Sequence, residues 1–464
     1  MSANEITINK ITIDEAPFNK YHLKLVAYCA GCPFVAGYVL GTVAISLSVM
    51  NTRIPMSPAL SGLIGMGTLL GMMFGSLFGG YATDLLGRKK MYILDFLFLG
   101  IVSVLQYFIT DPLVVFLLRM LLGVGLGATF TISGPYIAEF SPQKNRGAML
   151  GILNALWFIG YAASNVVCYL LLNFGDDSWK WMVVSGAVPC FLWLISIRNM
   201  PESPRWLIGK GRGNEVAAIL KKIGDNIVLS RESEPEPEGK ASFHELFNSG
   251  YGKWLFFVAF FWTMQIIPVF ALGTYLPTIM EQFGFADGNR QYLGSAIINS
   301  LYLIGLIFIF FFMDKSGRRP TLLISFFICF IALFILAFTA DMNLPFILVL
   351  ALFVLFGASN TAGGSHQFVY PNELFPTHIR ATAVGVMTSI TRIIAAIATF
   401  FTPIILSRFG LEATLYICAG LTLAGLVVSI IMAPETKDMS LTEASSLHTP
   451  RKAENTGSSV IRNR

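Results

Sequence analysis

The chain has few charged residues for its length, and this shortage excludes an ordinary soluble protein. Of its 464 residues only 13% are charged, against about 25% in an average soluble domain. Apolar residues make up 55% of the chain and include 39 Phe and 18 Met. The polar side chains that remain are too few to cover a water-exposed surface. Most of the surface must therefore face lipid.

The sequence also lacks a strong excess of one charge and a cysteine pattern typical of disulfides or of a zinc site. Its net charge of +5 is scattered along the chain, so we expect no nucleic-acid partner. All six cysteines lie in apolar runs, without the spacing of a disulfide framework or a zinc site. Cys29 and Cys32 are interpreted as core residues of a membrane helix, because a redox pair needs thiolates near water. We expect neither a metal nor a cofactor.

Membrane-spanning stretches account for most of the chain. Crossing the hydrocarbon takes about 20 mostly apolar residues, and such stretches recur about twelve times. The first set runs near Leu25–Met50, Ser61–Thr83, Met91–Thr110, Leu113–Ala138, Gly147–Asn173 and Trp181–Ile197. The second set runs near Trp254–Met280, Leu293–Met313, Thr321–Ala340, Leu344–Tyr370, Ala381–Leu406 and Ala413–Met432. We predict an all-α integral membrane protein with about 12 transmembrane helices in two bundles of about six.

Polar segments flank and separate the two predicted bundles, residues 25–197 and 254–432. Residues 1–24 contain no short apolar core before a cleavage site, so we expect no signal peptide to be removed. Residues 198–253 are rich in Glu, Pro, Lys, Ser and Gly and are interpreted as a soluble linker. Residues 433–464 form a polar tail.

Basic residues in the short loops predict the orientation of the protein. They occur at Arg88–Lys90, Lys144–Arg146, Lys315–Arg319 and Arg380, and these loops all fall on one side if the helices alternate. That side should face the cytoplasm, together with the linker and both termini. The compact loops are typical of bacterial proteins, so we expect a multi-pass protein of a bacterial inner membrane that works as a monomer.

The two halves of the chain carry the same polar marks in the same order. The matching pairs are Gly80–Lys90 with Asp314–Arg319, Glu139–Arg146 with Glu373–Arg380, and Pro201–Ser203 with Pro434–Thr436. Measured from 84 to 314, from 139 to 373 and from 201 to 434, the marks are 230, 234 and 233 residues apart. Order and spacing together indicate a duplicated helical unit.

On these motifs the chain, from Lys24 to Leu441, resembles the major facilitator superfamily, and most closely its sugar-porter and aromatic-acid-symporter branches. The resemblance implies two six-helix bundles around a central cavity that opens alternately to either side. It also implies transport driven by a gradient rather than by ATP. The sequence has no G-x-x-x-x-G-K-[ST] phosphate loop, which agrees with that expectation.

Charged loop residues are interpreted as gates that hold one face of the protein closed. Asp84 and Arg88 can pair with charges or helix dipoles of the opposite bundle. We expect Glu139 with Arg146, and Glu373 with Arg380, to form a network spanning both halves; alternatively, these charges only fix the topology. The expected gating residues are Gly80, Asp84, Gly87, Arg88, Glu139, Arg146, Asp314, Gly317, Arg318, Glu373 and Arg380.

Arg392 is the strongest indication of a substrate site. It lies about eleven residues into its predicted helix, roughly 16 Å deep in a core about 30 Å thick. An ionisable side chain at this depth marks a functional site by default. A forked, permanently charged guanidinium suits a carboxylate in bidentate contact. The alternative is a structural ion pair with another buried group.

Three further ionisable residues are candidates for coupling to a proton. Arg119 resembles the sugar-porter arginine that works with an acidic residue of the first helix, but Ala36 and Val39 stand where that acid is expected. Asp95 could carry the proton instead, or could be a hydrated structural acid near the cytoplasmic face. His366 titrates in the useful range, although a lone histidine is usually a packing residue.

Polar and aromatic residues near mid-membrane complete the candidate site. Tyr275-Leu-Pro277 looks like the end of the seventh helix of sugar porters, but the amide-rich pattern expected there is absent. Any of the aromatic residues could instead be lipid-facing or part of the core. With Arg392, the candidate wall residues are Tyr38, Asn154, Trp157, Tyr161, Gln265, Asn299, Tyr302 and Gln367.

We therefore expect a transporter, not an enzyme, that takes up a small organic carboxylate, aromatic or aliphatic, by alternating access, alone or together with a proton. A sugar or polyol transporter is the first alternative, and a multidrug exporter the second. A nutrient sensor would need a long cytoplasmic extension. An intramembrane enzyme would need a catalytic constellation, and the sequence has no His-Glu-x-x-His run and no convincing nucleophile beside a base.

Overall fold

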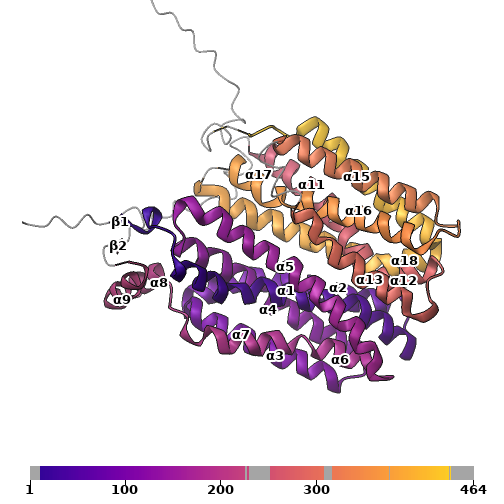
Figure 1. Ribbon diagram of the computed structural model, residues 1–464, viewed down its shortest axis with the longest axis horizontal. Helices are drawn as coiled ribbons and strands as arrows, with labels where there is room; N and C mark the ends of the chain where they lie inside the picture. Colours follow the sequence, from indigo (N-terminus) through magenta and orange to yellow (C-terminus); the bar gives the residue numbers. More distant parts are fainter. Residues whose placement is uncertain are drawn as a thin grey trace, which may run out of the picture.

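The computed structural model describes residues 11–224, 227–228, 251–307, 316–375, 377–437 and 439, and nearly all of them are helical. The N-terminal half contains α1 (Lys20–Arg53), α2 (Pro58–Leu86), α3 (Arg88–Leu105), η2 (Gln106–Phe108), α4 (Pro112–Phe140), α5 (Gln143–Leu171), η3 (Leu172–Phe174), α6 (Ser178–Val184), α7 (Ala187–Ser196) and η4 (Ile197–Asn199). The C-terminal half contains α11 (Gly252–Thr274), α12 (Leu276–Gln282), η6 (Asp287–Asn289), α13 (Arg290–Leu301), α15 (Arg318–Phe338), α16 (Phe346–Gly364), α17 (His366–Leu374) and α18 (Thr377–Met432). The two halves lie side by side (Figure 1).

The helices account for the predicted membrane crossings. Ten helical stretches of the described residues are long and apolar enough to span a membrane. One of them, Thr382–Met432, has 51 residues and at about 1.5 Å per residue is too long for one crossing of about 30 Å. It bends at Gly410, where φ is 82°, and this bend divides it into two crossings. The predicted span Leu293–Met313 begins in α13, and its residues 308–313 lie outside the described residues.

Glycines allow two helices of the N-terminal half to touch along their backbones. A Cβ placed on Gly71 of α2 would lie 2.9 Å from the Cα of Gly123 on α4, and one on Gly127 would lie 2.3 Å from the carbonyl oxygen of Met72. A larger side chain at these positions would push α2 and α4 apart. The close packing expected from the small residues around Gly123 is therefore present.

The segment interpreted as a soluble linker is folded in its first part. It forms α8 (Pro204–Gly209) and α9 (Gly213–Ile223), and α9 buries Val216, Ile219, Leu220 and Ile223. Asn19 Nδ2, just before α1, donates to the Ile223 carbonyl over 2.7 Å. The strands β1 (Ile11–Thr12) and β2 (Ile227–Val228) pair in parallel. In the chain β1 is followed directly by η1 (Ile13–Glu15), and β2 follows α9. This small sheet ties the N-terminal segment to the segment between the halves.

The two halves contact one another at the end that carries neither β1 nor α9 (Figure 1). Tyr275 Oη donates to the Ser61 carbonyl over 3.2 Å. Asn299 Nδ2 on α13 donates to Asn165 Oδ1 on α5 over 2.9 Å. We call this the closed end, and the opposite end, which carries Arg88 and Arg318, the charged end.

Candidate functional site

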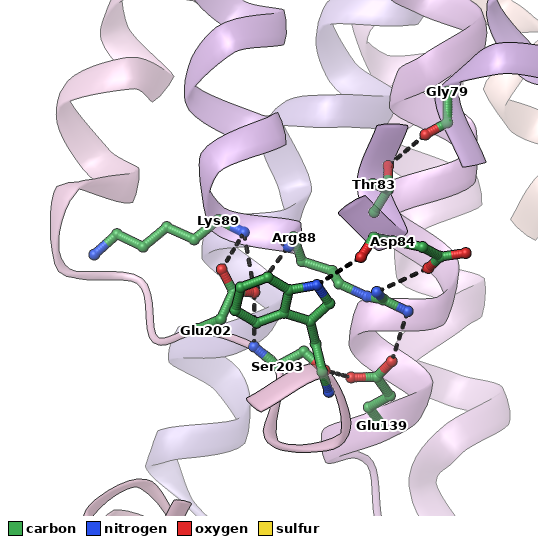
Figure 2. Close-up of polar contacts among 9 residues, drawn as sticks. Gly79, Thr83, Asp84, Arg88, Lys89, Glu139, Glu202 and Ser203 are labelled. Carbon is green, nitrogen blue, oxygen red and sulfur yellow. Dashed lines mark hydrogen bonds and ion pairs between the residues drawn. The ribbon is translucent and has the colours of Figure 1, made fainter. Parts of the chain in front are cut away.

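A polar network holds three helix ends of the N-terminal half together at the charged end (Figure 2). Arg88 lies between two carboxylates: its Nη1 is 3.0 Å from Asp84 Oδ1 and its Nη2 is 3.3 Å from Glu139 Oε1. The backbone N–H of Arg88 donates to Glu202 Oε1 over 2.8 Å, and Ser203 Oγ donates to Glu139. Glu202 therefore caps the start of α3. We call these residues the N-terminal network.

The C-terminal half repeats this network with the corresponding residues. Arg318 Nη2 lies 3.3 Å from Glu373 Oε1, and the Arg318 N–H donates to Glu435 Oε1 over 3.0 Å. Thr436 Oγ1 donates to Glu373, as Ser203 does to Glu139. We call these residues the C-terminal network. In both halves a tyrosine one turn before the glutamate donates over 2.9 Å to a proline carbonyl: Tyr136 to Pro201, and Tyr370 to Pro434.

The pairing of charges differs from the sequence prediction. We expected Glu139 with Arg146, and Glu373 with Arg380, in a network joining the halves. The structure instead pairs both glutamates with arginines of their own half, as described above. Arg146 Nη2 donates to the Ser141 carbonyl, and Arg380 Nε to the Phe375 carbonyl, each over 3.1 Å. The described contacts of both networks therefore stabilise each half separately.

The remaining predicted gating residues lie near the same networks. Gly87 and Gly317 have positive φ values of 94° and 90°. A Cβ at either position would lie 2.6 Å from the carboxylate of Glu202 or Glu435. Around Gly80 there is open space within 4 Å of the Cβ position, and Asp314 lies outside the described residues.

Glu435 has a shifted pKa with an identifiable cause. Partial burial raises the pKa of this carboxyl, but the backbone N–H groups of Arg318, Lys437, Arg319 and Thr436 outweigh that effect. The pKa of Glu435 therefore lies below its ordinary value, because these donors favour the ionised form.

Three amide side chains meet inside the C-terminal half. Gln265 on α11 donates from Nε2 to the Asn360 carbonyl on α16 over 3.2 Å, and Asn360 Nδ2 donates back to the Gln265 carbonyl over 3.1 Å. Gln367 on α17 donates to Gln265 Oε1 over 2.8 Å. Gln265 and Asn360 are buried and Gln367 is half-buried. We call these residues the amide cluster.

The hydrogen bonds of the amide cluster fix the orientation of its side chains and leave some of their donors and acceptors available for a solute. Each side-chain amide has two N–H donors and an oxygen that can accept two hydrogen bonds. Within the described residues, Gln367 Oε1 accepts no hydrogen bond. An oriented, partly exposed amide of this kind can bind a hydroxyl group of a solute.

Arg392 lies against α11 but apart from any acid. Its guanidinium carbon is 5.9 Å from the ring centre of Phe270, and the side chain is half-buried. In the part of the chain that the structure describes, Arg392 makes no hydrogen bond or ion pair. The alternative interpretation, a structural ion pair, would need an acid beside Arg392, and the described residues supply none.

Of the aromatic candidates of the N-terminal half, Tyr161 reaches the C-terminal half. Trp157 and Tyr161 on α5 stack with ring centres 5.5 Å apart and an angle of 15° between the rings. Tyr161 Oη lies 3.2 Å from the Cβ position of Gly273 on α11. Tyr38 instead donates to Ser185 Oγ over 3.1 Å within its own half, and Asn154 is half-buried on α5.

Asn299 and Tyr302 belong to the closed end and the core rather than to an open wall. Asn299 makes the bond between the halves described above. Tyr302 is 7% exposed, and its ring carbon Cε1 would lie 1.6 Å from a Cβ on Gly357. Tyr302 therefore fills the space that this glycine leaves.

The three coupling candidates are all buried, and their surroundings differ. Arg119 donates from Nη2 to Ser46 Oγ over 3.3 Å, and its buried Nη1 has no hydrogen-bond partner among the described residues. Both ring nitrogens of His366 have partners in its own half: Nε2 is 3.0 Å from Thr321 Oγ1, and Nδ1 is 2.9 Å from the Gly363 carbonyl. Asp95 accepts a hydrogen bond from Thr129.

Several residues of these sites were absent from the candidates chosen from the sequence. Glu202, Glu435, Ser203 and Thr436 were noticed only as marks of the repeat, although an acid recurring beside a prolyl residue was a signal for a helix cap. Asn360 lies in an apolar run next to small residues, and no sequence signal distinguishes it from a packing residue.

Two similar helical halves with a repeated polar network, joined at one end, have the architecture of the major facilitator fold. A solved structure titled as a partially occluded inward open conformation of the xylose transporter XylE from Escherichia coli has the same fold, with a TM-score of 0.77, 21% identity and coverage of 91% of this chain and 100% of that chain. The described helices thus belong to an all-helical membrane fold, as predicted.

The chain belongs to the sugar (and other) transporter family, whose profile matches residues 23–448. It is 35% identical over 434 residues to the protein YaaU of Escherichia coli (strain K12), covering 94% of this chain and 97% of that protein. It is 32% identical over 441 residues to the inner membrane metabolite transport protein YgcS of the same organism, covering 94% and 96%. The protein is thus a multi-pass membrane transporter and not an enzyme.

Proposed function

We propose that the protein imports a small polyhydroxylated metabolite, a sugar or a polyol, across a bacterial inner membrane. The amide cluster of Gln265, Asn360 and Gln367 carries this proposal, because sugars are bound through several amide donors and acceptors. The expected amide-rich sequence pattern is absent, but folding brings amides from α11, α16 and α17 together. The stacked rings of Trp157 and Tyr161 would supply an apolar surface for the solute.

The relatives support this class of substrate. XylE is titled a proton:xylose symporter in a second solved structure. The name of YgcS, an inner membrane metabolite transport protein, supports the proposed membrane. The charged end would face the cytoplasm, because basic loops are retained there. In that orientation the halves are joined at the outer end, so the solute would leave towards the cytoplasm. The opposite state requires the Tyr275–Ser61 and Asn299–Asn165 contacts to break.

A small organic carboxylate is the second candidate, and Arg392 favours it. The guanidinium has no described acid partner, and a half-buried guanidinium binds a carboxylate well. Arg392 would bind the anion, while Phe270 would contact an aromatic or aliphatic part of the solute. Uptake of an anion against an inside-negative potential would then need a co-transported cation.

Thermal unfolding of the purified protein with candidate ligands tests both proposals. The ligands are xylose, arabinose, myo-inositol, mannitol, benzoate and a cationic dye. A ligand at about 100 times its dissociation constant stabilises the folded protein by about 2.7 kcal/mol. For a sugar site, one of the polyhydroxylated ligands raises the melting temperature of the wild type but not of Gln367→Ala, while the exposed control Gln282→Ala behaves as the wild type.

A carboxylate site would give a different result. Benzoate would then stabilise the wild type and the exposed control Arg408→Gln, and would fail with Arg392→Gln. Arg392→Lys would also weaken binding, because the fork is lost while the charge remains. Stabilisation by the cationic dye alone would contradict both proposals and favour an exporter.

A further inference from the structure

Asp95, which belongs to neither network, differs from the carboxylates Glu139 and Glu373 of the N-terminal and C-terminal networks. Glu139 and Glu373 each lie beside an arginine. Asp95 lies on α3, seven residues after Arg88, which places it about 10 Å along the helix from the charged end. It is 5% exposed, and its only described hydrogen bond comes from Thr129.

The groups that face Asp95 from the packed helices are uncharged at neutral pH. They are Thr129 on α4, Cys32 on α1 and Cys190 on α7, with Tyr92 one turn earlier on α3. A Cβ on Gly125 of α4 would lie 3.1 Å from Asp95 Oδ1, so the helix backbone closes over the carboxyl group. No cation is described in contact with it. A carboxylate enclosed in this way is strongly disfavoured in its charged form.

The hydrogen bonds around Thr129 accommodate both states of the Asp95 carboxyl. Thr129 Oγ1 is within hydrogen-bond distance of both Asp95 Oδ2 and the Gly125 carbonyl, the latter at 3.1 Å. The single hydroxyl proton of Thr129 can be donated to only one of them. Thr129 donates to Asp95 when the carboxyl is ionised. When Asp95 carries a proton, it can donate that proton to Thr129 Oγ1, and Thr129 then donates to the Gly125 carbonyl.

We propose that Asp95 is the proton-binding group of the transport cycle, holding its proton in the conformation seen here. This inference rests on the proposed import function. Ala36 and Val39 are buried apolar residues of α1, so the position where a proton-binding acid was expected cannot serve. Asp95 supplies an acid in the same half, on a neighbouring helix.

The cycle moves one proton with each solute. Asp95 binds a proton in the opposite conformation, in which the halves have separated at the closed end. The protein, carrying the proton and the solute, then returns to the conformation seen here. On the charged-end side the O–H bond of Asp95 ionises and the proton passes to water. Thr129 and Ser133, one turn apart on α4, lead towards that end, and Ser133 Oγ donates to the Thr129 carbonyl over 3.3 Å. No electron is transferred in this step.

Infrared spectroscopy of the detergent-purified protein tests the proton site without a substrate. The carbonyl stretch of a protonated carboxyl is followed between about pH 5 and pH 9, and the spectrum of Asp95→Asn is subtracted. The expected result is a titrating band in the wild type and in the exposed control Asp341→Asn that is missing in Asp95→Asn. In Thr129→Val the midpoint should rise by about half a pH unit or more, because the ionised form loses a donor.

Transport in proteoliposomes then tests coupling, with the sugar or carboxylate that stabilises the protein as the solute. A gradient of about one pH unit should support about tenfold accumulation by the wild type at one proton per solute. Asp95→Asn should exchange the solute at equilibrium but lose this accumulation. Three results would each overturn the assignment. The wild type could lack the titrating band, the midpoint could stay unshifted in Thr129→Val, or Asp95→Asn could accumulate the solute fully. If no solute stabilises the protein, only the proposed function fails, and the infrared result still decides the proton site.

Discussion

The N-terminal and C-terminal networks make the same contacts with slightly different residues and different burial. Ser203 in one corresponds to Thr436 in the other, and both donate to the buried glutamate. The Glu139 side chain is 8% exposed, whereas Glu373 is 15% exposed. In the N-terminal half, Trp206 Nε1 on α8 also donates to the Asp84 carbonyl over 2.8 Å. What the halves share is one carboxylate capping a helix start and another neutralising an arginine.

This comparison indicates what the charged loops do in the conformation seen here. A cross-bundle gate would join the two halves, but the described contacts fix the helix ends within each half. Each half is therefore stabilised as a unit that can move against the other with little internal change. The following predictions separate the two networks, in order of decreasing expected effect.

Removing Glu139 or Glu373, the glutamates paired with Arg88 and Arg318, should have the largest effect. Glu139→Ala leaves Arg88 with only the exposed Asp84 as a described carboxylate partner. It should cost about 2–3 kcal/mol of stability, because the guanidinium loses its less exposed counter-charge. Glu373→Ala should cost less, since Glu373 is more exposed. Thermal unfolding in detergent measures both, with the exposed Glu412→Ala as control. Equal losses in all three variants would contradict the account.

Alanine at the two positive-φ glycines should have the next largest effect. Gly87→Ala and Gly317→Ala should each cost about 1–2 kcal/mol from backbone strain, and further stability from displacing the capping carboxylate. Gly175→Ala is a matched control, because Gly175 has a φ of 88° with open space around its Cβ position. If Gly175→Ala is as destabilising as the other two, the contact with Glu202 or Glu435 contributes nothing.

Acid should weaken the C-terminal network through Glu435. Its pKa is lowered in the folded protein, so its contribution is fully present above the pKa of the unfolded chain, about 4.3, and is lost as the pH falls through the lower folded value. The melting-temperature difference between wild type and Glu435→Gln should thus be largest at neutral pH and shrink in acid. A difference that grows on acidification would reverse the assigned direction of the pKa shift.

Exchanging the hydroxyl residues should have the smallest effect. Ser203→Thr and Thr436→Ser keep the hydroxyl donor to Glu139 or Glu373, so each should change stability by about 0.5 kcal/mol or less. Ser203→Ala removes the donor and should cost about 1 kcal/mol. The same unfolding measurement compares them, and a Ser203→Ala variant as stable as Ser203→Thr would remove the hydroxyl from the network.

Much of the fold could be predicted from the sequence, because long apolar stretches and basic loops depend on local composition. The spans, the repeat and the gathering of charges at one end were predicted in this way. Interruptions such as Ser185–Gly186 between α6 and α7, or Tyr275 between α11 and α12, were missed because hydropathy does not register a local change of helix geometry.

The partners within the sites could not be predicted. Arg88 meets the capping carboxylate of Glu202 across 114 residues of sequence, and the choice of Glu139 over other acids depends on how three helix ends pack. Gln265 and Gln367 were chosen as wall residues, but their contact with Asn360 depends on the relative rotation of α11, α16 and α17.

Distances between spin labels test most directly whether the halves move as units. Labels on Lys144→Cys with Ser316→Cys probe the charged end, and labels on Asn51→Cys with Asp341→Cys probe the closed end; the six native cysteines are buried. Adding the ligand that stabilises the protein should change the two distances in opposite directions, while a Lys90→Cys with Lys144→Cys pair within the N-terminal half stays unchanged. Unchanged distances at both ends, or an equal change within one half, would contradict the account.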